Sequence, residues 1–178
     1  MTFDPETRRR RSIRLKEYDY SQAGAYFVTI CTHGHVCLLG EIVEGEMILN
    51  GAGVIVLEVW GQLPRHYAHV VLDSFVIMPN HVHGVVVLGD NSAIRAGLKP
   101  APTVRRVHGL QEIVRAFKTF SSRRINEFQG TRGVPVWQRN YYEHIIRSYK
   151  TLNAMREYIE KNPSQWQKDR DNPAVPRL

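Results

Sequence analysis

The chain has 178 residues, 43% of them hydrophobic, which is enough to bury one core, so we expect one main domain. Lys and Arg number 24 against 17 Asp and Glu, and the net charge of +7 favours a polyanionic partner such as nucleic acid. Neither a bilayer-spanning apolar stretch nor an apolar leader segment is evident, so we expect a soluble, cytoplasmic protein with no membrane partner.

Residues 1–24 form a basic arm in this interpretation. The arginines that we expect to contact phosphates are Arg8, Arg9, Arg10, Arg11 and Arg14. A solvated arm that contacts nothing is the alternative, and charge alone leaves both open.

The first half of the chain alternates strand and helix signals. Residues 26–32 are rich in β-branched and aromatic side chains, which predicts a strand, and residues 40–50 predict a small hairpin. Apolar residues at helical spacing predict a helix over 51–67. Strands are predicted over 70–78 and 81–88, antiparallel across a Pro-Asn turn.

A long Pro-bearing loop is predicted for residues 89–108. The second half then predicts a helix over 110–125, a strand near 141–146 and a final helix over 148–161. Pro163 disfavours helical backbone at the preceding residue, so the final helix should end there.

This element order describes a split βαβ unit repeated, typical of an α+β, ferredoxin-like fold. We therefore expect a four-stranded antiparallel sheet with two helices on one face, and the C-terminal helix as an addition. The domain would span residues 25–163, followed by a tail over 164–178. The opposite face of the sheet would be open, as in folds that bind single-stranded nucleic acid.

His81, Val82 and His83 begin the predicted strand 81–88. Side chains alternate along a strand, so the two histidines share one face and Val82 points to the other. Two imidazoles on one face can bind a divalent metal, or can be two hydrogen-bonded histidines on a half-exposed sheet. His33 and His35 also flank one residue, but that residue is glycine, and we expect a loop there.

Tyr158 and Asn162 lie four residues apart on the final predicted helix and so share a face. A phenol can attack phosphorus and form a phosphotyrosine, and an amide oxygen can bind a hard cation. Spacing alone favours structural roles: a tyrosine half-buried beside Met155 and Ile159, and an asparagine at the helix terminus.

Cys31 and Cys37 do not form a Cys-x-x-Cys pair, and a second cysteine pair is lacking. The sequence therefore predicts reduced thiols without a zinc site.

Several blocks together resemble one bacterial family. They are Arg10-Arg-Ser-Ile-Arg14, Tyr18-Asp-Tyr20, Tyr26-Phe-Val-Thr-Ile-Cys-Thr32, Met78-Pro-Asn-His-Val-His83, Val136-Trp-Gln-Arg-Asn-Tyr-Tyr-Glu-His-Ile-Ile-Arg147 and Glu157-Tyr-Ile-Glu-Lys-Asn-Pro163. In combination and order they resemble the REP-associated tyrosine transposases. These are HUH single-strand DNA endonucleases related to insertion-sequence transposases.

The resemblance implies that His81 and His83 bind Mg²⁺ or Mn²⁺, that Tyr158 is the nucleophile and that Asn162 is the third ligand. Insertion-sequence members carry glutamine at the last position. It also implies cleavage of hairpin-forming single strands from palindromic repeats, through a covalent 5′-phosphotyrosine and a free 3′-hydroxyl. Such proteins act in transposition and recombination at the bacterial nucleoid, and this branch is expected to be monomeric, although relatives dimerise.

Further DNA contacts are expected from Lys118, Arg123, Gln138 and Arg139, with Trp137 touching bases. Alternative phenols are Tyr141, Tyr142 and Tyr149, and His144 could support the site. Two other functions fit the same residues less fully: a non-catalytic nucleic-acid-binding module, and a phosphodiesterase that uses water.

Overall fold

The computed structural model describes residues 18–89 and 108–175, so the five arginines predicted to contact phosphates lie outside the described residues. The main sheet consists of Gly24–Cys31 (β1), Val70–Met78 (β4), His81–Leu88 (β5) and Tyr142–Ile146 (β6). Its order is β4-β5-β1-β6, and every neighbouring pair is antiparallel. The predicted α+β fold with a four-stranded antiparallel sheet is therefore confirmed.

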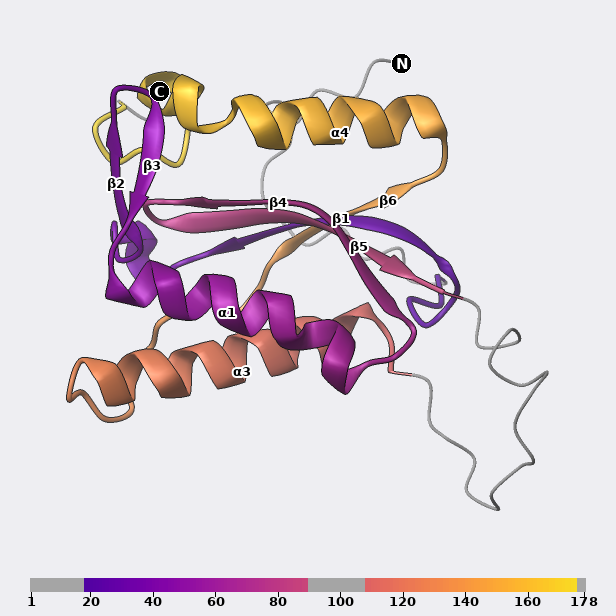
Figure 1. Cartoon of the computed structure of the whole chain (residues 1–178), viewed down its shortest axis with the longest axis horizontal. Helices are drawn as coiled ribbons and strands as arrows, with labels where there is room; N and C mark the ends of the chain where they lie inside the picture. The colour runs from indigo at the N-terminus through magenta and orange to yellow at the C-terminus, as the bar shows by residue number, and fades with distance from the viewer. Residues whose placement is uncertain (1–17, 90–107, 176–178) are drawn as a thin grey trace.

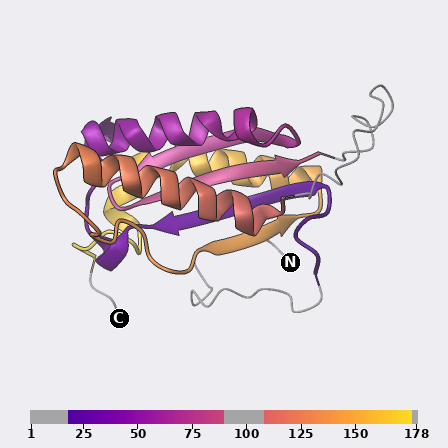
Figure 2. The same ribbon diagram turned by 90° about the horizontal axis from the view of Figure 1, so that it is seen from below.

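Helices cover both faces of this sheet (Figure 1). Gly51–His66 (α1) and Leu110–Phe128 (α3) lie side by side on one face (Figure 2), while Tyr149–Lys161 (α4) crosses the other. The expectation of an open second face is wrong. The apolar stripe of α4 needs burial, and this face of the sheet provides the apolar surface.

Alternation along the strands divides the core into two layers. Val28, Val82 and Val86 pack in the large cluster under α1 and α3. Phe27 and Val85, on the other face, form a smaller cluster with α4. His83 and His81 are two and four residues from Val85 along β5, so their side chains point to the same face as Val85, the face covered by α4. The alternation of side chains along a strand predicts that the two histidines share a face.

Helix α4 is held to the sheet by apolar packing and by an ion pair. Met155 and Ile159 are buried, and burying side chains of this size contributes about 1.5–3 kcal/mol each. Arg156 donates two hydrogen bonds to the carboxylate of Asp73, at 2.8 and 2.6 Å. Asp73 lies where the register of β4 shifts between Leu72 and Phe75, and such an irregularity can re-aim a side chain.

Shorter elements complete the fold. The predicted hairpin is present as Gly40–Val43 (β2) and Glu46–Leu49 (β3). His33–His35 forms a single 3-10 turn, η1, and Pro163–Lys168 forms a second, η2, directly after α4. Within the two described ranges, none of the helices combines the length and the apolar character that crossing a bilayer requires.

Candidate metal and nucleophile site

The two histidines of β5 approach each other closely inside the protein. His81 is fully buried and His83 is nearly so. Their Nε2 atoms are 3.1 Å apart, and the rings meet edge to face. Two imidazole nitrogens this close must share a cation, either a proton or a metal ion, or their lone pairs repel.

Asn80 sets the tautomer of His81. The Asn80 amide nitrogen donates to the backbone oxygens of His35, at 3.1 Å, and Asp171, at 2.6 Å. This orientation leaves Asn80 Oδ1 as the acceptor for His81 Nδ1, at 2.8 Å. The proton of a neutral His81 ring therefore lies on Nδ1, and Nε2 presents its lone pair toward His83.

His83 is oriented by β1. Its Nδ1 is 2.8 Å from the hydroxyl of Thr29, and its ring stacks on Phe27 with 5.4 Å between centroids. A metal-binding histidine usually has such a partner on its second nitrogen, which fixes the direction of the first.

Asp169 adds a carboxylate to the pair. Its Oδ2 is 3.7 Å from His81 Nε2, and the ligand atoms of His81, His83 and Asp169 all lie within 4.8 Å of one another. Two imidazoles and one carboxylate form a group that can hold a divalent metal ion. Our sequence reasoning missed Asp169 because it assigned residues 164–178 to a tail. The acidic residues Asp169 and Asp171, close together in this tail, were the available signal.

Tyr158 reaches the histidines from α4. Its hydroxyl is 3.4 Å from His83 Nε2, and the two rings are 5.2 Å apart. Phe27 contacts both rings, so one side chain of β1 positions the phenol and the imidazole together. The structure thus brings Tyr158 and both histidines into one group, although β5 and α4 are far apart in the chain.

Asn162 follows Tyr158 by one helical turn and caps α4. Its side chain is buried, and its Oδ1 has no hydrogen-bond partner among the described residues. A buried oxygen without a partner is costly, so it is suited to accept a donor or to coordinate a cation.

The residues predicted to contact DNA fall into two places. Lys118 donates to the backbone oxygens of Gln138 and Arg139, and burial lowers the pKa of its ammonium group. Its side chain therefore joins α3 to the segment before β6. Arg139 itself is exposed.

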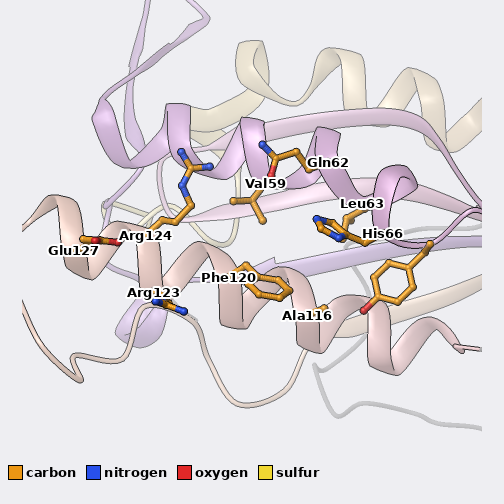
Figure 3. A pocket seen from close by; sticks show the side chains of 10 residues that line it. Val59, Gln62, Leu63, His66, Ala116, Phe120, Arg123, Arg124 and Glu127 are labelled. Carbon is orange, nitrogen blue, oxygen red and sulfur yellow. The ribbon is translucent and has the colours of Figure 1, made fainter.

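Arg123 lies elsewhere. It lines a groove between α1 and α3 with Leu63, His66 and Phe120, on the face of the sheet opposite the histidines (Figure 3). Trp137, expected to touch bases, is instead buried in the core, where its indole N–H donates to the Ser121 hydroxyl. Its backbone forms an isolated β-bridge with Thr32.

The alternative phenols differ in their surroundings. Tyr149 is 73% exposed at the start of α4. Tyr142 is half-buried on β6 and contacts Phe27 edge-on. His144 pairs with Phe27 across the strands, so it lies on the α4 face.

Comparison with known proteins supports the fold and a family. None of the protein-family models matches the chain. A solved structure of a REP-associated tyrosine transposase bound to a REP hairpin aligns with a TM-score of 0.56 at 18% identity, covering 83% of this chain and 71% of that one. This identity supports a shared transposase-like fold and nothing finer.

A protein of Haemophilus influenzae described as uncharacterized is 40% identical over 169 residues, covering 90% of this chain and 91% of its own length. The chain belongs to the same family as this Haemophilus influenzae protein.

Proposed function

We propose that the protein is a metal-dependent single-strand DNA endonuclease and strand transferase that acts through a covalent 5′-phosphotyrosine on Tyr158. The observation that carries the proposal is the approach of the Tyr158 hydroxyl to His83, within a group that also contains His81 and Asp169. A phenol beside a cation site suits nucleophilic attack by tyrosine on a phosphodiester.

The metal would be held by His81, His83 and Asp169, with Asn162 Oδ1 as a further oxygen ligand. A bound Mg²⁺ or Mn²⁺ supplies charge that neutralises a phosphate oxygen and polarises phosphorus. The side chains around it have separate tasks. Asn80 keeps the His81 lone pair available, and Phe27 holds the Tyr158 ring next to His83.

In the reaction, the Tyr158 oxygen forms a bond to phosphorus as the bond to the 3′-oxygen breaks. The phenol proton is lost and the leaving oxygen becomes a 3′-hydroxyl, so no external energy source is needed. Attack of another 3′-hydroxyl on the phosphotyrosine reverses the step and joins two strands.

The substrate we propose is a single strand that carries a hairpin from a palindromic repeat. The net positive charge favours DNA, and the structural relative was solved with a REP hairpin. Arg139 and the arginines of the amino-terminal arm would contact phosphates, and the protein would act as a monomer in the bacterial cytoplasm.

The test is to incubate the protein with a labelled hairpin-bearing single strand and Mg²⁺ or Mn²⁺. We expect a denaturation-resistant protein–DNA adduct that Tyr158→Phe abolishes while DNA binding persists. Tyr149→Phe, an exposed phenol on the same helix, is the matched control and should retain the adduct. DNA binding that no metal alters, with no adduct in any variant, would favour the non-catalytic binding module.

A further inference from the structure

A second group of potential ligands lies beside the first and takes no part in the proposed cleavage. Cys31 ends β1, His35 lies in the turn η1, and Asp171 lies in the segment after η2. Their ligand atoms all fall within 4.8 Å of one another. Cys31 and Asp171 are buried, and 19% of the His35 side chain is exposed.

The spacing within this group suits coordination better than a direct hydrogen bond. His35 Nδ1 and Asp171 Oδ1 are 3.5 Å apart, which is long for a nitrogen–oxygen hydrogen bond. Two ligands bound at 2.0–2.1 Å to one tetrahedral ion would lie roughly 3.3 Å apart. An ion between these atoms therefore requires only small movements.

The chemistry of the three side chains selects the ion. A thiolate and a carboxylate carry two negative charges, which one divalent cation neutralises. Sulfur favours zinc over magnesium or manganese, and the mixed sulfur, nitrogen and oxygen set matches zinc.

The surroundings hold the three ligands in place. Asn80 donates to the backbone oxygens of both His35 and Asp171, so one buried amide links two of the three residues. Asp171 Oδ2 is also 4.0 Å from His81 Nδ1, so this second group lies next to the candidate metal site formed by His81, His83 and Asp169.

We propose that Cys31, His35 and Asp171 bind a structural Zn²⁺ ion, with solvent at the fourth position on the side of His35. The ion joins the segment that carries Asp169 and Asp171 to the end of β1, and so holds Asp169 beside His81. The sequence predicted reduced thiols without a zinc site, because the three ligands lie on separate segments and their spacing matches no known zinc motif.

X-ray absorption at the zinc edge tests this proposal. The full chain with Cys37→Ser and His81→Ala, which remove the exposed cysteine and one ligand of the neighbouring candidate metal site, is loaded with one equivalent of Zn²⁺. We expect one sulfur at about 2.3 Å together with nitrogen and oxygen ligands, and that sulfur can then come only from Cys31. A zinc shell of nitrogen and oxygen alone would overturn the proposal.

Cobalt provides a second readout. Co²⁺ bound to the wild-type protein should show a thiolate charge-transfer band that persists in Cys37→Ser and His81→Ala and disappears in Cys31→Ser. Persistence of the band in a folded Cys31→Ser protein would contradict the assignment. Because neither readout involves DNA, the zinc site and the proposed cleavage can fail separately.

Discussion

Replacing Asn80 should lower both the stability of the protein and its affinity for metal. Its buried side chain makes three hydrogen bonds: one from His81 Nδ1 and two to the backbone oxygens of His35 and Asp171. Asn80→Ala leaves those groups without this partner, and each unsatisfied buried group costs about 1–3 kcal/mol. Since His35 is partly exposed and water can reach it, we expect the free energy of unfolding to fall by about 3 kcal/mol.

The same substitution should weaken the metal site selectively. Without Asn80 Oδ1, His81 is free to carry its proton on Nε2, which removes the lone pair that faces His83. Losing such a supporting partner typically lowers metal affinity 10–100-fold, or by about 1.4–2.8 kcal/mol. Mn²⁺ titration by calorimetry, at a temperature where the variant is folded, measures the change. A Cys31→Ser background keeps the neighbouring group from contributing.

Asn50→Ala is the matched control, because Asn50 also makes three side-chain hydrogen bonds. It caps α1 rather than supporting the histidines, so its loss should cost about 1 kcal/mol of stability and leave Mn²⁺ affinity unchanged. If folded Asn80→Ala binds Mn²⁺ as tightly as the Asn50→Ala protein, the argument about the His81 tautomer is refuted.

Two further predictions concern the attachment of α4 and the core. The two hydrogen bonds from Arg156 lower the pKa of Asp73 from its ordinary value of 3.8 to about 2. The ion pair therefore stabilises the folded protein fully at pH values above 3.8, and this contribution is lost as the pH falls toward 2. Thermal melts across that range should show a loss of stability that is smaller in Asp73→Asn; an identical loss would contradict the pairing. Ser121→Ala leaves the buried Trp137 N–H without its acceptor and should cost about 1–3 kcal/mol in denaturant unfolding, whereas exposed Ser164→Ala should cost under about 0.5 kcal/mol. Equal denaturant midpoints for the two serine variants would refute the claim that the hydrogen bond from Trp137 to Ser121 stabilises the core.

Local periodicity predicted much of the site. The alternation of side chains along a strand predicted that His81 and His83 share one face of the sheet. Helical spacing predicted that Tyr158 and Asn162 share one face of the final helix. Periodicity does not say which face of a sheet a helix covers, so the position of α4 had to come from the structure. The apolar stripe with Met155 and Ile159 indicated only that α4 must pack against something.

The remaining parts of the site depend on contacts between distant segments. Asp169 approaches His81, and Asp171 approaches Cys31 and His35, across more than 80 residues of chain. The two acidic residues indicate a possible ligand segment, but the local sequence does not show which distant residues this segment contacts. Asn80 was predicted only as a turn residue, because its hydrogen bonds reach two segments whose positions the sequence does not reveal.

The most direct test of the central claim is to identify the residue joined to DNA. The adduct formed with a hairpin-bearing single strand is digested with protease and nuclease, and the linked peptide is sequenced by mass spectrometry. Our account predicts a nucleotide phosphate on Tyr158, in the peptide that contains Glu157 to Lys161. A phosphate on Tyr141, Tyr142 or Tyr149, or cleavage that leaves no linked peptide, would contradict it.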